Sequence, residues 1–240
     1  MILTFTDFGW QGPYLGEMRA AALRLAPTVP YVDLMADAPA FRPDLAAYLL
    51  AALAPRRWRG DVVIAVVDPG VGTERAPLAV MVNDVWFVGP DNGLFELLIR
   101  RTDKVLVHEI TLRPKELSAS FHGRDIFAPM AGRIAAGKLA GLKGGSVTRY
   151  PDWPDELDRI VHIDAYGNLV TGRRAVTVPP GAVLGHGEQR IRQAAVFGAV
   201  PPGTLFWYAN SCGLLEIAQN QGSAARTLGL AVGDSAPVAT

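Results

Sequence analysis

The sequence contains few of the residues that build disulfide-held or metal-held frameworks. Its 240 residues include a single cysteine, Cys212, and only four histidines. A lone cysteine forms no internal disulfide, and the sequence carries no cysteine and histidine cluster with zinc-ligand spacing. We therefore expect no bound metal, and the cysteine usage is typical of a protein of the reducing cytoplasm.

An excess of charge of one sign is also absent. Lys plus Arg and Asp plus Glu number 23 each, which removes the electrostatic basis for binding nucleic acid or an anionic membrane. The apolar stretches end well short of the roughly 20 residues that a membrane-spanning helix needs. The first residues lack the basic and apolar regions of a signal peptide. These absences predict a soluble, cytoplasmic protein with no nucleic-acid or membrane partner.

Half of the residues are hydrophobic, which is enough for a sizeable core. In the first part of the chain, short β-rich runs alternate with helical patterns. This alternation predicts a three-layer α/β domain with a mostly parallel sheet. We expect strands at residues 2–6, 31–35, 61–67, 78–83 and 85–88, and helices at residues 16–25, 44–53, 94–101 and 126–136.

The pattern changes after Gly137, where Gly, Lys and Pro become frequent. Short β-rich runs separated by Gly and Pro turns then follow, which is typical of a small β-barrel or sandwich. The predicted strands are residues 158–164, 175–178, 189–194 and 204–209. We expect an N-terminal α/β domain of residues 1–145, a linker of residues 146–157 and a smaller C-terminal β-barrel domain of residues 158–240.

Two acidic loops follow predicted strands. Asp7 and Phe8 come directly after the first strand, and ligands of open α/β sheets bind at the carboxyl ends of strands. A carboxylate there accepts both hydroxyls of a ribose, although an ordinary turn residue is the alternative. Asp68 follows the most apolar strand in a glycine-containing loop that ends at Arg75. An arginine beside a carboxylate keeps it ionised and able to orient a water, although a structural ion pair also explains the two.

The other motifs are each compatible with a structural role. Residues 89–93 form a turn signature, and residues 120–125 precede a helix with Asp125 as the expected N-cap. His122 lies in that loop, where a surface position is the alternative to catalysis. In the second domain, Asp164 and Tyr166 offer a carboxylate and an aromatic face, which suit an amino group and a purine. A hairpin turn accounts for Asn168, and a solvated edge strand for the polar residues after residue 208.

Together and in this order, the motifs resemble those of the S-adenosylmethionine hydroxide adenosyltransferases, which are related to the fluorinase and chlorinase enzymes. The resemblance extends from Thr6 to about Leu230 and so covers nearly the whole chain. The segments that carry it are TDFG at 6–9, DPGVG at 68–72, Arg75, GPDNG at 89–93, FHGRD at 121–125, YGN at 166–168 and NS at 210–211.

The resemblance implies hydrolysis of S-adenosyl-L-methionine to adenosine and L-methionine, by in-line attack of an activated water on ribose C5′. It implies no cofactor, because S-adenosylmethionine is the substrate, and a homotrimer with active sites between subunits. Asp68, Arg75 and His122 would position and activate the water. The implied substrate contacts are Asp7 with the ribose, Asn168 and Gln221 with adenine, Phe8, Phe41, Phe121 and Tyr166 packed on the ligand, and Asp164 and Ser211 with methionine.

Departures from the family pattern affect the methionine end, where Gly12, Cys212 and Gln219 replace residues that relatives often carry. A halogenase is the less favoured alternative, because an anionic Asp68 beside the nucleophile site repels halide. A nucleoside-binding module without turnover is a third possibility. Such a module would retain the contacts of Asp7 and Asn168, yet would be indifferent to loss of Asp68, Arg75 or His122.

Overall fold

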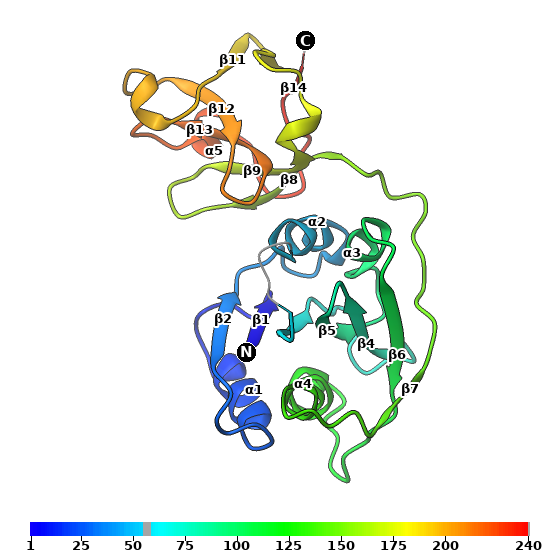
Figure 1. Ribbon diagram of the computed structural model, residues 1–240. Coiled ribbons are helices and arrows are strands. Elements are labelled where there is room, and N and C mark those ends of the chain that lie inside the picture. The colour runs from blue at the N-terminus through cyan, green and yellow to red at the C-terminus, as the bar shows by residue number, and fades with distance from the viewer. Residues whose placement is uncertain (55–58, 240) are drawn as a thin grey trace. The chain divides into compact units, whose positions relative to one another are not determined.

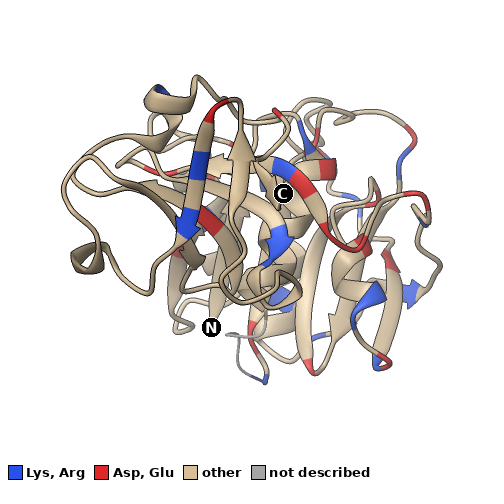
Figure 2. Ribbon diagram, turned by 90° about the horizontal axis from the view of Figure 1, so that it is seen from above, with Lys and Arg blue, Asp and Glu red and all other residues tan. Residues whose placement is uncertain are grey.

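The computed structural model describes residues 1–54 and 59–239 (Figure 1). The chain divides into two compact units, Met1–Pro151 and Asp152–Thr240. Acidic and basic residues are interspersed over the strands and loops of both units (Figure 2), as the equal totals of 23 suggest. Each unit is built on one seven-stranded sheet.

The sheet of the first unit has the strand order β2-β1-β3-β5-β4-β6-β7. Its strands are β1 (Ile2–Thr6), β2 (Tyr31–Met35), β3 (Val62–Val66), β4 (Pro77–Val82), β5 (Val85–Pro90), β6 (Val105–Ile110) and β7 (Leu142–Gly144). The pairings from β2 to β5 are parallel, whereas β5–β4, β4–β6 and β6–β7 are antiparallel. We therefore correct the expected mostly parallel sheet to a mixed one. The sequence pattern also missed β6 and β7.

A tight hairpin causes this change of direction. Asn83 and Asp84 join β4 to β5 with φ values of 49° and 65°. Two consecutive positive φ values are those of a type I′ turn, whose twist matches that of paired antiparallel strands. The predicted strands of residues 78–83 and 85–88 therefore pair as an antiparallel hairpin.

Helices cover both faces of this sheet, which confirms the three-layer α/β architecture (Figure 1). Helices α1 (Tyr14–Leu23) and α4 (Ala128–Ala135) lie on one face, and α2 (Pro43–Leu53) and α3 (Glu96–Arg100) on the other. Gly132 allows the close approach of α4 to α1, because a Cβ there would lie 2.4 Å from the Ala22 carbonyl oxygen. A π-helical turn at Gly123–Phe127 leads into α4.

The centre of the sheet determines where two acidic residues emerge. All five residues of β3 are buried, and β3 pairs in parallel with β1 in a register that places Thr6 opposite Val66. Asp7 and the loop that starts at Asp68 therefore leave neighbouring strands at the same carboxyl-terminal edge. This is the edge at which open α/β sheets bind ligands.

The second unit has the strand order β14-β10-β11-β12-β13-β9-β8. Its elements are β8 (Leu157–Ile163), β9 (Leu169–Arg174), β10 (Leu184–His186), β11 (Gln189–Gln193), β12 (Leu205–Ala209), β13 (Leu214–Gln219), the helix α5 (Ala224–Leu228) and β14 (Val238–Ala239). The predicted strand at residues 175–178 is wrong, because Ala175–Thr177 forms a 3₁₀ turn. The edge-strand alternative is also wrong, because β13 lies between β12 and β9 and its first five residues are buried.

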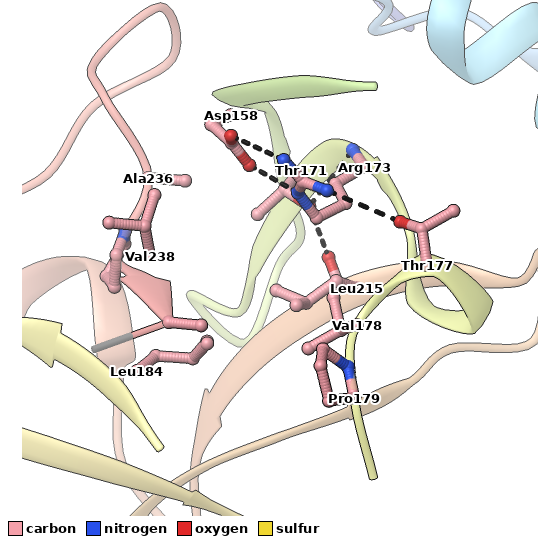
Figure 3. A pocket seen from close by; sticks show the side chains of 12 residues that line it. Asp158, Thr171, Arg173, Thr177, Val178, Pro179, Leu184, Leu215, Ala236 and Val238 are labelled. Carbon is pink, nitrogen blue, oxygen red and sulfur yellow. Dashed lines mark hydrogen bonds and ion pairs between the residues drawn. The ribbon is translucent and has the colours of Figure 1, made fainter. Parts of the chain in front are cut away.

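This sheet curls into a half-barrel, and the C-terminal segment connects its two edges. Ser235 bridges Arg159 of β8, while β14 pairs with β10. Beneath this segment lies a cavity of about 230 Å³ (Figure 3). The Arg173 guanidinium binds the Asp158 carboxylate at the cavity, with an Nε to Oδ1 distance of 2.5 Å. Closure by a short segment, in place of a full strand ladder, makes this domain a partial barrel.

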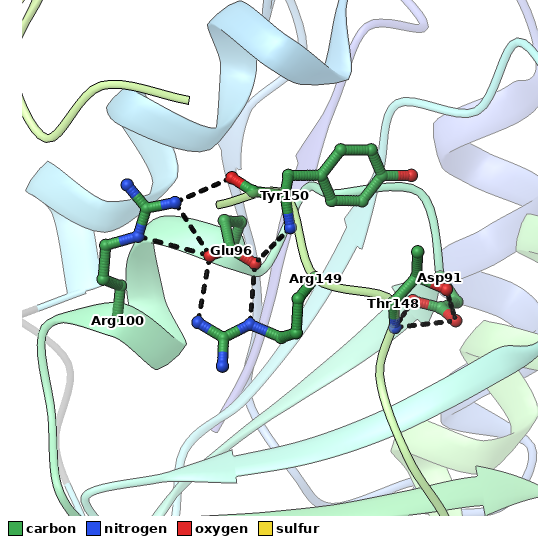
Figure 4. Close-up of polar contacts among 6 residues, drawn as sticks. All are labelled: Asp91, Glu96, Arg100, Thr148, Arg149 and Tyr150. Atoms are coloured by element: carbon green, nitrogen blue, oxygen red, sulfur yellow. Dashed lines mark hydrogen bonds and ion pairs between the residues drawn. The ribbon is translucent and has the colours of Figure 1, made fainter. Parts of the chain in front are cut away.

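A buried carboxylate holds the end of the first unit in place (Figure 4). Glu96 is 1% exposed and accepts hydrogen bonds from the Arg100 and Arg149 guanidinium groups and from the backbone N–H of Tyr150. Burial opposes ionisation of Glu96, but these donors outweigh it and lower its pKa to about 2. The carboxylate therefore fastens residues 149–150 to helix α3, which carries Glu96 and Arg100, while Thr148 is bound by the Asp91 carboxylate.

We expect Glu96→Gln to lower the free energy of unfolding of the first unit by about 2–3 kcal/mol at neutral pH, because charge-assisted hydrogen bonds are lost. The folded-state pKa lies below the unfolded value of 4.5, so the stabilisation is present above that value and is lost as the pH falls toward about 2. Urea denaturation of wild type and variant at pH 7 and pH 3 measures this difference.

The control for this experiment is Glu116→Gln, which removes an exposed carboxylate from the same unit. The Glu116 variant should match wild type at both pH values. A Glu96 variant as stable as wild type at pH 7, or a deficit that does not shrink with acidification, would contradict the assignment.

Candidate active site

An ion pair lies in the loop that follows β3. The Arg75 guanidinium binds both oxygens of the Asp68 carboxylate, with Nε 2.8 Å from Oδ1 and Nη2 bound to Oδ2. The side chains of Arg75 and Asp68 are 9% and 4% exposed. The bidentate geometry fixes the orientation of both groups.

His122 completes this group from the segment that precedes the π-helical turn. Its Nδ1 lies 3.1 Å from Arg75 Nη2. A guanidinium only donates hydrogen bonds, so Nδ1 is the acceptor and the proton of the neutral ring is on Nε2. Burial and the positive charge of Arg75 lower the pKa of His122 below its usual value, although Asp68 partly offsets them. At neutral pH His122 is therefore a neutral donor through Nε2–H.

A glycine allows the two segments of this site to meet. Gly72 has a φ of +82°, and a Cβ at this position would lie 2.5 Å from the Ala119 carbonyl oxygen. The loop that carries Asp68 and Arg75 can therefore contact the segment that carries His122. The DPGVG motif thus has a steric reason for its second glycine.

Asp7 is a partly buried carboxylate to which the structure assigns no cation among the described residues. Its Oδ2 accepts the backbone N–H of Phe41 at 2.9 Å. Burial raises the pKa of Asp7, the hydrogen bond from Phe41 partly offsets this, and the nearby Asp68 raises it further. Phe41 itself has a φ of 61° and is 74% exposed. An inward carboxylate without a cation is typical of a binding site.

The front pocket is the cavity of about 520 Å³ that these residues line. Three aromatic rings stand edge to face at its wall, with centroid distances of 6.0 Å for Phe8–Tyr14, 5.9 Å for Phe8–Phe121 and 5.4 Å for Tyr14–Phe121. The predicted site residues that line it are Asp7, Phe8, Phe41, Asp68, Phe121 and His122. Arg75 does not line this pocket and contacts it through Asp68 and His122.

In the second unit, the β8–β9 turn collects three predicted residues. The Asp164 carboxylate accepts the backbone N–H groups of Tyr166 and Asn168 and the amide of Asn168, each at 2.9 Å. Asn168 is 3% exposed, and its Oδ1 has no hydrogen-bond partner among the described residues. The turn therefore presents an exposed ring, that of Tyr166, beside a free amide acceptor.

The two remaining predicted residues lie at opposite ends of β13. The backbone N–H of Ala225 donates to the carbonyl of Gly167 at 2.9 Å, which brings the turn containing Gln221 toward the β8–β9 turn. Ser211 precedes β13, and the register that pairs Leu214 with Arg174 and Ile217 with Leu169 places it at the other end. Among the described residues, no hydrogen bond joins Ser211 to Asp164.

Two family models match the sequence. The model for the SAM hydroxide adenosyltransferase N-terminal domain covers residues 2–143, and that for the C-terminal domain covers residues 158–236. The chain belongs to the SAM hydroxide adenosyltransferase family. The predicted resemblance is confirmed.

Known members of the SAM hydroxide adenosyltransferase family are similar over nearly the whole chain. A protein of Thermus thermophilus named (R)-S-adenosyl-L-methionine hydrolase is 37% identical, over 95% of each chain. One of the same name from Salinispora arenicola is 32% identical, over 95% of this chain and 94% of its own. A solved structure of a conserved hypothetical protein from Thermus thermophilus has a TM-score of 0.74 at 35% identity, covering 97% of this chain and 96% of that chain.

A solved structure from Thermotoga maritima, described as an uncharacterized conserved protein, has a TM-score of 0.81 at 29% identity and covers 98% of both chains. Within the described residues, no helix is both long and apolar enough to cross a membrane. The same residues contain no group of three or more His, Cys, Asp or Glu side chains placed to hold a metal ion.

The sequence did not predict several residues that line or support the front pocket. Tyr14, Glu17 and Arg124 line the front pocket; of the first two, only Glu17 lies within a predicted helix, that of residues 16–25. The Asn92 amide donates to the Val67 carbonyl at 2.8 Å, which holds the end of β3 directly before Asp68. The GPDNG motif therefore positions the loop that carries Asp68 in addition to forming a turn.

Asp125 does not have its predicted role. It lies inside the π-helical turn Gly123–Phe127 instead of capping a helix at Ile126. Its carboxylate accepts the backbone N–H of Ser118 at 2.8 Å and binds the Arg124 guanidinium. Since Ser118 belongs to the segment before His122, Asp125 holds that segment against the helix. The π-helical turn occupies the predicted start of the helix at residue 126, so α4 begins only at Ala128. Residue propensities do not reveal such a turn.

Proposed function

We propose that this chain hydrolyses S-adenosyl-L-methionine to adenosine and L-methionine. The observation that carries the proposal is the Asp68–Arg75–His122 group, which borders a pocket that also contains the Asp7 carboxylate. Relatives named (R)-S-adenosyl-L-methionine hydrolase support the substrate and the reaction. A positively charged sulfonium substrate also suits a pocket with the acidic residues Asp7, Glu17 and Asp68.

The reaction needs no covalent intermediate with the enzyme. A water oxygen forms a bond to ribose C5′ while the C5′–S bond breaks, and that electron pair returns to sulfur. Methionine leaves as a neutral thioether and the water loses one proton. Because the leaving group is already excellent, the protein has to position the water and accept its proton.

The hydrogen-bond directions assign these two tasks to different residues. His122 Nδ1 is occupied by Arg75, so His122 acts on the water by donating from Nε2–H and thereby orients it. Each Asp68 oxygen accepts one Arg75 hydrogen bond and keeps a further lone pair. We therefore propose that Asp68 takes the proton of the attacking water. Arg75 would stabilise the hydroxide-like negative charge that develops on the water oxygen.

The proposed substrate contacts are those that the family resemblance implies. Asp7 would accept the ribose hydroxyls, with Phe8, Phe41, Phe121 and Tyr166 packed on the ligand. Asn168 fits the adenine edge, because its unpaired Oδ1 is an acceptor for an amino group, and the backbone near Gln221 would assist. Asp164 and Ser211 are proposed for the methionine end. We also propose a cytoplasmic homotrimer, and multi-angle light scattering of the purified protein tests the assembly.

The decisive experiment is incubation of purified protein with S-adenosylmethionine in oxygen-18-labelled water, followed by chromatography with mass detection. The proposal expects adenosine and methionine in equal amounts, with the label in the 5′-hydroxyl. Each sulfonium epimer is supplied separately, because the relatives' name specifies the R form. No product despite binding would indicate a binding module, and halogenated adenosine in chloride or fluoride would indicate a halogenase.

The pH dependence of turnover is expected to report His122. Because the pKa of His122 is lowered, the neutral ring persists below its ordinary value, and kcat should remain constant down to about pH 6.5. Further acidification protonates Nδ1, which then faces the Arg75 donor, and activity should fall. Steady-state kinetics from pH 4.5 to 8.5 measure this; a decline that begins above pH 7 would contradict it.

A further inference from the structure

A second cavity lies against the same group of catalytic residues. This rear cavity has a volume of about 450 Å³. Its lining includes Arg75, Glu74 and Ala76 from the loop after β3, Glu109 from β6, and His122. The established family and the proposed reaction assign it no role.

His122 is the boundary between the two cavities. Among the described residues it alone lines both the front pocket and the rear cavity. The segment before it alternates, since Leu117 and Ala119 line the rear cavity while Ser118 and Ser120 line the front pocket. The segment of residues 117–122 therefore forms the wall between the front pocket and the rear cavity, and the His122 imidazole lies in this wall.

Arg75 lines the rear cavity and has one hydrogen-bond donor without a partner among the described residues. Its Nε and Nη2 are occupied by Asp68 and His122, whereas Nη1 is buried without a hydrogen-bond partner among the described residues. The side chain is 9% exposed and lines only the rear cavity of the two. The guanidinium also lies over the Phe127 ring, with Cζ 5.4 Å from the ring centroid.

We propose that the rear cavity is the route by which the nucleophilic water reaches His122. The inference rests on the proposed hydrolysis. The proposal assumes that a substrate seated in the front pocket covers that side of His122, so that a water displaced during binding returns through the rear cavity. The rear cavity meets the site at the residue that orients the water.

The lining suits water better than an anion. Glu74 and Glu109 place two carboxylates around the cavity, opposite Arg75 and Arg113. Glu109 is itself paired with Lys143 at 2.9 Å. A neutral dipole that both donates and accepts is compatible with this mixed lining, whereas two acidic and two basic side chains give an anion no net electrostatic attraction.

The test uses larger side chains that narrow the rear cavity, placed at residues other than Asp68, Arg75 and His122. Ala119 is an exposed residue of the wall that lines the rear cavity and not the front pocket. We expect Ala119→Phe to lower kcat at least 10-fold, Ala119→Leu to have a smaller effect, and Ala119→Ser to match wild type. Adenosine affinity, measured by calorimetry, should be unchanged in all three. Leu117→Trp fills the same cavity from a second position and should also lower kcat.

The matched control is Ala140→Phe, which adds the same ring to an exposed alanine of the same unit outside both cavities. Unchanged kcat in both Ala119→Phe and Leu117→Trp would overturn the water route while leaving the hydrolase intact. Weaker adenosine binding in parallel with kcat would place residues 117 and 119 in the front pocket and would also overturn it. Absence of turnover in the wild type would instead reject the hydrolase.

Discussion

Replacing His122 by alanine is expected to lower kcat about 10²- to 10³-fold, because the reaction loses a fixed donor to the nucleophilic water. Adenosine affinity should remain close to that of wild type, since Asp7 and the aromatic wall are untouched. Steady-state kinetics and calorimetry with adenosine measure the two quantities on the same preparation. His186→Ala removes a partly exposed histidine from β10 of the second unit and is the control.

A conservative variant separates orientation from base catalysis. Asparagine at position 122 retains a side-chain N–H donor but has no basic nitrogen at neutral pH. If His122 orients the water, His122→Asn should recover a measurable part of the activity that His122→Ala loses. Equal loss in the two variants would contradict the donor role, and equal losses of kcat and adenosine affinity would remove His122 from the chemical step.

Replacing Asp7 by asparagine is expected to weaken adenosine binding about 10²-fold, or about 3 kcal/mol, because charge-assisted hydrogen bonds to the ribose hydroxyls are lost. Asparagine is chosen because its amide oxygen can still accept the backbone N–H of Phe41, which Asp7 binds at 2.9 Å. The loop geometry should therefore persist. Calorimetry with adenosine measures the loss.

Deoxynucleosides supply the internal check for Asp7. Wild type should bind 2′-deoxyadenosine more weakly than adenosine, whereas Asp7→Asn should bind the two with similar affinity. Asp37→Asn, which neutralises an exposed carboxylate in the loop after β2, is the control and should behave as wild type. Equal discrimination between the nucleosides in wild type and Asp7→Asn would assign Asp7 a purely structural role.

The sequence predicted best the features that depend on short stretches of chain. The apolar run that became β3 is buried at every position, and the helix predicted at residues 44–53 is α2, which begins one residue earlier at Pro43, a position that first-turn prolines favour. The Asn83-Asp84 turn and the β8–β9 hairpin also follow from local preferences. Residues 175–178 were misassigned because a β-branched run in a turn resembles a strand until its partners are known.

The candidate site was predicted in part for the same reason. Asp7 and Asp68 each follow a strand directly, so a rule about strand ends located them. Tyr14, Glu17 and Arg124 lie on helical segments whose orientation toward the front pocket depends on packing. Asn92 was read as a turn residue because its bond to the Val67 carbonyl spans 25 residues of sequence.

By itself, the sequence determined the α/β class, the presence of a second β-rich domain, the family and the set of reactive side chains, because residue type, local propensity and motif order suffice for these. The tertiary structure decided that Asp68, Arg75 and His122 bond to one another, that Nδ1 of His122 is an acceptor, and that His122 separates two cavities. Hydrogen-bond direction and cavity boundaries depend on distances between segments 47 residues apart along the chain, which only the packing of the strands and helices fixes.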